Sequence, residues 1–162
     1  MQRITPFLWF DTEAEEAARF YVGIFENSEV TNIARYADTG PGPGPGPAGG
    51  VMTVSFRLDG QEFVALNGGP SFKFTEAVSF VVHCDTQEEI DRLWSALTDG
   101  GEEVQCGWLK DRYGLSWQIV PNALGDLMSD PDPEKTQRVM QAMLGMVKLD
   151  IAALQHAAAG PG

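Results

Sequence analysis

Two histidines, His83 and His156, are the only imidazoles that this chain offers for acid–base chemistry. In an alternating strand, His83 shares a side with Ser79 and Val81. General acid–base catalysis needs a partner acid or nucleophile within hydrogen-bond reach, and the sequence places none beside His83. We therefore favour a structural, hydrogen-bonded His83 over a catalytic one and keep it as a candidate for the rim of a ligand pocket. We expect His156, near a helix end, to be solvated.

Two cysteines, Cys84 and Cys106, are the only thiols. A nucleophilic cysteine needs a nearby cation or helix N-terminus to lower its pKa. In the expected strand around Cys106, alternation leaves only Lys110 on the same side, so we expect no catalytic thiol and assign no catalytic residue. Cys84 is expected to pack as a small core hydrophobe. Two cysteines at this spacing form neither a disulfide scaffold nor a zinc site, which indicates a reduced, cytoplasmic protein.

The elements expected to position these residues begin with a strand over 2–10, a helix that a Thr12–Glu15 capping box starts and that runs to about Glu26, and a strand over 28–37. A hairpin over 51–67 turns at Asp59-Gly60. Between them, the glycine–proline run of 40–50 is expected to be a loop. Its prolines remove the backbone N–H groups that a phosphate-binding loop needs.

The second half repeats this order. A strand over 78–84 leads to a helix that Asp85 caps, with Glu88 at the reciprocal position, and Gly100-Gly101 ends it. A short strand over 103–110 and a return strand over 115–120 follow. The two halves therefore predict a duplicated βαβββ unit.

The tail after residue 121 differs from both halves. Asp132 is a predicted cap before Pro133, and an apolar stripe predicts one long helix. That stripe consists of Met140, Met143, Val147, Ile151 and Leu154. We expect it to pack on the body of the protein rather than on a second subunit.

Composition limits the classes of function. The chain has 162 residues, with 11 Lys and Arg against 23 Asp and Glu, so its formal net charge is −12. Such a protein repels phosphate backbones and anionic lipid surfaces, so we expect neither a nucleic-acid nor a membrane partner. Hydrophobic residues, with Met and Cys included, make up 43% of the chain, which is enough for a globular core.

Several motifs together resemble the PhnB-like branch of the vicinal oxygen chelate superfamily, which includes glyoxalase I and the bleomycin- and fosfomycin-resistance proteins. They are Thr5-Pro6-Phe7-Leu8-Trp9-Phe10-Asp11, Ala17-Ala18-Arg19-Phe20-Tyr21, Gly60-Gln61-Glu62-Phe63, Leu66-Asn67-Gly68-Gly69, Phe72-Lys73-Phe74 and the run from Cys106 to Gln118. Members of this branch often carry the inherited name 3-demethylubiquinone-9 3-methyltransferase. We interpret that name as a misannotation, because no glycine-rich turn typical of adenosylmethionine binding is present.

The resemblance implies an α+β fold of two βαβββ modules, whose curved antiparallel sheets form a cup that holds a small ligand, and it implies a homodimer. Residues 1–121 would form the paired domain, with module one at about 1–70 and module two at about 78–121, and 122–162 a C-terminal helical extension packed on it. The metal-ligand positions of the superfamily fall near Ile4, Ala65, Ser79 and Gln118. None is His, Cys, Asp or Glu, so we expect no metal and no cofactor.

Polar residues at or beside those positions either bond one another or face a ligand in the cup. The ligand-pocket candidates are Asn67, Ser79, His83 and Gln118, with Trp9 and Phe63 in the apolar wall alongside Phe10, Trp108 and Trp117. The leading hypothesis is a small-molecule-binding protein. The alternatives are a metal-assisted lyase, isomerase or dioxygenase, and a dimeric interaction module.

Overall fold

The computed structural model describes residues 2–37 and 47–161 of the chain, and the chain divides into two compact units, Met1–Phe74 and Thr75–Gly162. Most of the loop predicted over 40–50 therefore lies outside the described residues. Its last part, Ala48–Gly50, forms a turn in which the Tyr36 N–H donates to the Gly50 carbonyl at 2.8 Å. No helix among the described residues is both long enough and apolar enough to cross a bilayer.

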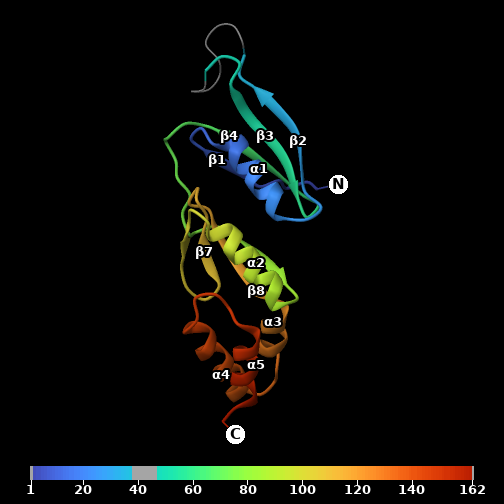
Figure 1. The fold of residues 1–162 in the computed structure, drawn as a ribbon, viewed down its shortest axis with the longest axis vertical. Helices are drawn as coiled ribbons and strands as arrows, with labels where there is room; N and C mark the ends of the chain where they lie inside the picture. The colour runs from blue at the N-terminus through green and yellow to red at the C-terminus, as the bar shows by residue number, and fades with distance from the viewer. Residues whose placement is uncertain (1, 38–46, 162) are drawn as a thin grey trace. The chain divides into compact units, whose positions relative to one another are not determined.

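The first unit is one four-stranded sheet, here called sheet A, with a single helix on one face (Figure 1). Its elements are β1 (Phe7–Phe10), α1 (Ala14–Ile24), β2 (Glu29–Arg35), β3 (Val51–Leu58) and β4 (Gln61–Asn67), and its strand order is β1-β4-β3-β2. Alternation decides which side chains meet α1. In β3, Val54, Phe56 and Leu58 are buried while the residues between them are only half-buried.

The β3–β4 hairpin forms as the sequence predicts. Asp59 and Gly60 both have positive φ, at 49° and 79°, which is the backbone conformation that a two-residue primed turn requires. Asp and Gly tolerate that conformation better than other residues. The strand predicted over 2–10 is shorter, because only Phe7–Phe10 pairs continuously with β4.

The start of α1 differs from the predicted capping box. Glu13 is the N-cap and makes no side-chain cap bond. The Ala14 N–H donates instead to Asn67 Oδ1 at 2.8 Å, so the cap comes from the end of β4. A distant side chain thus replaces the local Thr12 cap, and sequence spacing alone does not reveal this contact.

The second unit contains the same motif. Its elements are β5 (Ser79–Cys84), α2 (Gln87–Thr98), β6 (Glu102–Glu103), β7 (Trp108–Lys110) and β8 (Ser116–Pro121), and the strand order of this sheet B is β5-β8-β7-β6. The predicted duplication and the α+β fold class are confirmed. Both sheets are mixed rather than wholly antiparallel, because the helix carries the chain across the sheet and the first strand pairs parallel with the last.

The cap of α2 lies one residue later than predicted. Thr86, not Asp85, is the N-cap, and its hydroxyl accepts a bond from the Glu89 N–H at 3.2 Å. In return, the Glu89 carboxylate accepts a hydrogen bond from the Asp85 N–H, also at 3.2 Å. The reciprocal arrangement is therefore present with its register moved by one position.

Three helices follow β8 in the second unit: α3 (Asn122–Met128), α4 (Pro133–Leu144) and α5 (Ile151–Ala159). The Asp132 cap at Pro133 is as predicted, with the Glu134 N–H bonded to Asp132 Oδ1 at 3.0 Å. The prediction of a single long helix is wrong. α4 ends at Gly145, and Asp150 caps a new helix by accepting from the Ala153 N–H at 2.8 Å.

The three helices share a small apolar cluster. Val139, Leu154 and Ala158 are its buried centre, and Met143 is among the half-buried residues around it. Met140 of the predicted stripe is instead 40% exposed.

Candidate ligand-binding site

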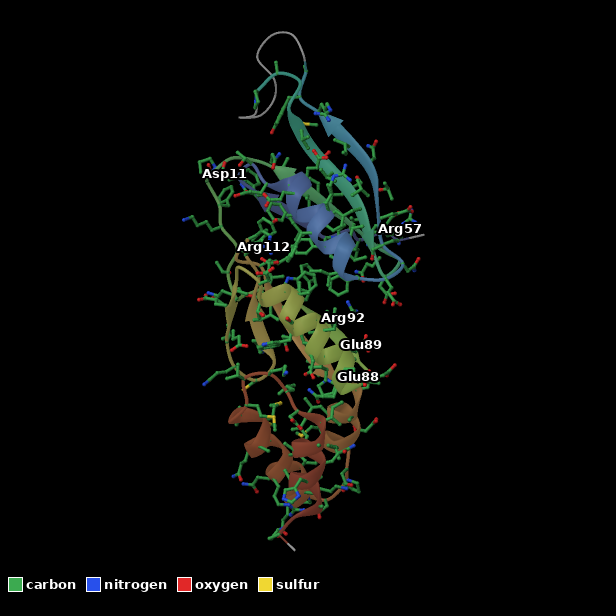
Figure 2. All side chains as sticks on the ribbon, in the orientation of Figure 1. Asp11, Arg57, Glu88, Glu89, Arg92 and Arg112 are labelled. Carbon is green, nitrogen blue, oxygen red and sulfur yellow. The ribbon has the colours of Figure 1, made fainter. Side chains whose placement is uncertain are left out.

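Each sheet has one face covered by its own helix and one that its helix leaves uncovered. On sheet B, α2 packs along β8 (Figure 1), where Trp117 and Ile119 are buried. The residues between these two point to the opposite face, which we call the outer face of sheet B. The charged side chains Glu88, Glu89 and Arg92 lie along α2 itself (Figure 2).

Strand register arranges the outer face of sheet B in three rows. Residues paired across neighbouring strands point the same way, so the pairings place their side chains side by side. The first row is Ser79, Ser116, Lys110 and Glu102, the second is Val81, Gln118 and Trp108, and the third is His83 and Val120.

Two residues predicted at the pocket, Ser79 and Gln118, contact each other directly. Gln118 Nε2 donates to Ser79 Oγ at 2.9 Å, across β5 and β8. No other side-chain hydrogen bond of either residue occurs within residues 2–37 and 47–161, so the Gln118 carbonyl oxygen and the Ser79 hydroxyl hydrogen stay available. The pair therefore offers one acceptor and one donor toward the outer face.

Lys110 is the one Lys or Arg residue in these three rows. Its Nζ forms an ion pair with Glu76, from the segment before β5, and lies 3.6 Å from Glu102 Oε1. The hydrogen bond between Lys110 and Glu76 lowers the pKa of the Glu76 carboxyl and raises the pKa of the Lys110 ammonium. The first row is thus a line of two hydroxyls, an ammonium and a carboxylate.

The second and third rows supply apolar surface. Trp108 is half-buried, whereas Val81 is 44% exposed beside Gln118. His83 is exposed in the third row, on the same face as Ser79 and two rows away. An apolar surface with a few polar groups in fixed positions is the usual lining of a small-molecule site.

The remaining pocket candidates lie in the first unit, and two of them have structural roles. Asn67 is fully engaged: its Oδ1 caps α1 at Ala14, and its Nδ2 donates to the Val51 carbonyl at 3.1 Å. Phe63 is buried toward α1 and stacks on Phe56 with ring centroids 5.5 Å apart. Alternation places Asn67, Phe63 and the predicted ligand position Ala65 on the helix-covered face.

Trp9 lies on the other face of sheet A. Its indole N–H donates to the Gly69 carbonyl at 2.9 Å, and its ring meets Phe72 edge-on at a centroid distance of 4.9 Å. In the register, Trp9 lies beside Leu66, with Thr53 next along the same row. At the far end of this sheet, Arg57 (labelled in Figure 2) pairs with Glu29 at 2.7 Å.

A cleft opens at the start of α1, and Asn67 is the one pocket candidate from the sequence that lines it. It measures about 430 Å³ and lies between the ends of β1 and β4 and the beginning of β3. Its lining includes Asp11, Thr12, Glu15, Asn67 and Gly69. The one sequence signal for this cleft is the acidic start of the helix, and the helix dipole already explains why acidic residues occur there.

The thiols occupy different surroundings. Cys84 is buried, and desolvation raises its pKa to about 11, as expected for a core residue. Cys106 lies in the turn before β7, with φ at 58°, rather than in a strand. The predicted shared face with Lys110 therefore does not form, because a residue in a turn does not follow strand alternation.

The donor atoms at the implied metal positions do not suit a first-row divalent ion. Ser79 and Gln118 provide a hydroxyl and an amide, and the amide nitrogen is directed at the hydroxyl. Such ions prefer imidazole, thiolate or carboxylate ligands. Across the part of the chain that the structure describes, no group of three or more His, Cys, Asp or Glu side chains is placed to hold a metal ion.

Comparisons with known proteins identify a family and similar folds. A model of the 3-demethylubiquinone-9 3-methyltransferase family matches residues 2–120. Among solved structures, the PhnB protein from Bacillus cereus is 39% identical with a TM-score of 0.66, over 74% of this chain and 99% of that chain. A protein from Pseudomonas aeruginosa is 20% identical with a TM-score of 0.58, over 75% and 98%.

The similarity extends to a more distant fold relative. The fosfomycin resistance protein FosX from Listeria monocytogenes, solved with Mn(II) and a sulfate ion, is 14% identical with a TM-score of 0.50, over 74% of this chain and 89% of that chain. At that identity it shares the fold alone. No curated protein matches this chain significantly. The family match ends at residue 120, so α3, α4 and α5 lie beyond it.

Proposed function

Because the chain belongs to the PhnB-like 3-demethylubiquinone-9 3-methyltransferase family, in the vicinal oxygen chelate superfamily, we propose that it binds a small polar molecule on the outer face of sheet B. The observation that carries this proposal is the direct contact of Ser79 with Gln118 beside the apolar surface of Trp108 and Val81. These residues leave a donor and an acceptor facing away from the helix-covered core.

Binding without a tightly held metal is the form of the proposal that the side chains favour. A hydroxyl and an amide coordinate a divalent ion weakly compared with the imidazole and carboxylate ligands of metal enzymes. FosX was solved with Mn(II), but its likeness to this chain is one of fold. Metal-assisted lyase, isomerase or dioxygenase chemistry would need ligands that Ser79 and Gln118 do not provide.

Methyl transfer, which the family description names, has no support in the elements of this chain. The turns that lead from β1 to α1 and from β5 to α2 contain no glycine. Each sheet has only one parallel strand pair, whereas the doubly wound dinucleotide-type fold needs a mostly parallel sheet. We therefore propose that the name does not describe the reaction of this chain.

A homodimer is the second candidate function, as an interaction module, and a specific observation favours it. Within their own sheets β1 and β5 are edge strands, and exposed apolar side chains lie in β1 and just before β5. Phe7 is 58% exposed in β1, and Val78 is 64% exposed next to β5. An edge strand with exposed apolar side chains can pair with another chain. Sedimentation velocity tests it: a monomer across the micromolar range would exclude the dimer.

The cellular location is proposed as cytoplasmic. Both cysteines are free thiols, and one of them is a buried core residue, which suits a reducing compartment. Fractionation of expressing cells checks this assignment directly.

The binding proposal is tested by a thermal-shift screen of small polar molecules. A ligand that binds only the folded state at about 100 times its dissociation constant adds roughly 2.7 kcal/mol of stability. The variant Gln118→Met should remove the shift, because it keeps the volume and deletes the amide. The control Ser55→Ala, on sheet A, should keep it. If no compound shifts the wild-type protein, or if the shift survives Gln118→Met, the proposal is wrong.

Metal content is measured on the same preparation. We expect well below one equivalent of any divalent metal after purification without chelators. One tightly held equivalent that Gln118→Met releases would instead establish a metal site on the outer face.

A further inference from the structure

The outer face of sheet B contains a hydroxyl whose hydrogen bonds the protein does not supply. Ser116 is 1% exposed, and its Oγ has no hydrogen-bond partner within residues 2–37 and 47–161. Buried hydroxyls are normally paired, because losing contact with water without a replacement bond costs stability. Ser116 therefore has an unused donor in the first row of the proposed binding face.

The neighbours of Ser116 show what kind of group would pair with it. Register places Ser79 on one side and Lys110 on the other, all on the same face. Two hydroxyl donors next to an ammonium form a linear set of donors with a positive charge at one end. Such a set suits an oxyanion, which accepts several hydrogen bonds and prefers at least one charged donor.

A carboxylate of the chain already lies against this set. Glu76 forms the ion pair with Lys110, although it comes from a turn before β5 and not from a strand of sheet B. Its side chain is 55% exposed, so water competes for it. Exposed ion pairs of this kind contribute little to stability, and a competing anion can replace one partner.

We propose, as an extension of the proposed function, that the ligand of the outer face carries a carboxylate and that Lys110, Ser116 and Ser79 bind this group. When the ligand is absent, the Glu76 carboxylate forms the ion pair with Lys110 in its place. Binding is then an exchange of one carboxylate for another on the same ammonium, and no covalent bond changes. The rest of the ligand packs against Trp108 and Val81 in the second row.

Charge explains why Glu76 has to leave. Lys110 contacts both Glu76 and Glu102, so the group of three has a net negative charge and repels a free carboxylate. Removing the Glu76 charge makes the group neutral and frees donor hydrogens of the ammonium. An anionic ligand must therefore bind Lys110 more strongly than the Glu76 carboxylate does.

The test compares sodium benzoate with benzamide, which has a similar shape and no charge, at constant ionic strength. Binding is followed by NMR at the Trp108 indole N–H and the Gln118 side-chain amide. Glu76→Gln should bind benzoate at least about threefold more tightly than wild type, which corresponds to the strength of an exposed ion pair. The matched control is Glu29→Gln, which removes a carboxylate paired with Arg57 on sheet A and should leave both affinities unchanged.

Two variants at the binding row complete the test. Lys110→Gln should abolish the preference for benzoate over benzamide, because it removes the charged donor. Because Ser116 is buried, Ser116→Ala is compared with Ser116→Cys. The Cys variant keeps the size of the side chain and weakens the hydrogen-bond donor, so it should lower benzoate affinity without unfolding the protein.

The outcomes separate this inference from the proposal it rests on. Equal binding of benzoate and benzamide by Glu76→Gln would overturn the carboxylate preference while leaving small-molecule binding on the outer face intact. Binding of neither probe by Glu76→Gln would also overturn the inference. A failed thermal-shift screen, by contrast, would remove the proposed function itself.

Discussion

The indole N–H of Trp117 donates a hydrogen bond to Asp111 Oδ2 at 2.9 Å, and both residues are buried. The other carboxylate oxygen, Oδ1, accepts the backbone N–H groups of Tyr113 at 2.8 Å and Leu115 at 3.1 Å. One side chain therefore fixes the turn between β7 and β8 and the indole on the α2 side of sheet B. This turn sets the register that places Lys110 beside Ser116.

Replacing Asp111 should destabilise the second unit. Asp111→Ala leaves the Trp117 indole and two backbone N–H groups without their acceptor, and each buried unpaired donor costs roughly 1–3 kcal/mol. We expect a loss of at least about 2 kcal/mol in the free energy of unfolding, measured by urea denaturation. Asp111→Asn keeps one acceptor oxygen and should lose less. An unchanged midpoint for Asp111→Ala would contradict this role.

Asn67 should act as a cap and not as a ligand group. Asn67→Ala removes both the acceptor for Ala14 and the donor to Val51, with an expected loss of roughly 1–3 kcal/mol in unfolding free energy. Asn67→Asp retains the acceptor at the helix start and should recover part of that loss. The exposed Asn32→Ala is the control and should change stability by less than about 0.5 kcal/mol. Equal effects of the Ala and Asp variants would argue against the cap.

Gly68 should tolerate no side chain. A Cβ at this position would lie 2.3 Å from Cε2 of the Trp9 ring, so the ring or the strand end would have to move. Gly68→Ala should therefore destabilise the first unit by about 1–3 kcal/mol, as overpacking does. Gly23 provides the matched control in α1, where nothing lies within 4 Å of an added Cβ. Gly23→Ala should be neutral or stabilising by up to about 1 kcal/mol. Thermal unfolding that ranks these two variants the other way would show that Trp9 can move freely.

The Lys110–Glu76 ion pair should respond to pH in a defined window. The pKa of Glu76 lies below its ordinary 4.5 and that of Lys110 above its ordinary 10.5, in each case first because of their mutual hydrogen bond. A depressed carboxyl pKa contributes stability above pH 4.5 that is lost as pH falls through the folded value. A raised ammonium pKa contributes stability below pH 10.5 that is lost as pH rises through the folded value.

The measurement is a carbon-detected NMR titration of the Glu76 carboxyl in wild type and in Lys110→Gln. We expect the wild-type midpoint below 4.5 and a return toward the ordinary value in the variant. A wild-type midpoint at or above the ordinary value would show that Glu76 does not engage Lys110 in solution.

The duplicated fold could be predicted because its signals are local. The Asp59-Gly60 turn, the alternation in β3 and the apolar stripe of α2 each depend on residues a few positions apart. The same reasoning misplaced the start of α1, since its cap, Asn67, is distant in sequence and only the parallel pairing of β1 with β4 brings it close. The pairing of the two modules into one cup stays a prediction.

The candidate site could be predicted in part for a related reason. The sequence indicates both Ser79 and Gln118 as candidates, and these two side chains meet because β5 pairs with β8. The sequence does not indicate Ser116 or Glu76 as site residues, and Lys110 enters only through its expected position beside Cys106. A serine in a strand and a lysine near a turn have ordinary sequence contexts, and only the register of β7 on β8 reveals that they lie in one row. Phe63 is a candidate for the apolar wall of the pocket, and alternation in β4 directs its side chain into the core.

The parallel pairing of the first strand with the last in each unit bears on how the chain folds. β1 has only β4 as a partner in its sheet, and β5 has only β8, so neither strand can pair before the last strand of its own sheet has been made. Closing such long loops is entropically slow, and contacts between distant segments lower folding rates. During synthesis, the apolar strand around Phe7 therefore stays unpaired until the ribosome has released β4. We expect chaperones to matter most during this interval.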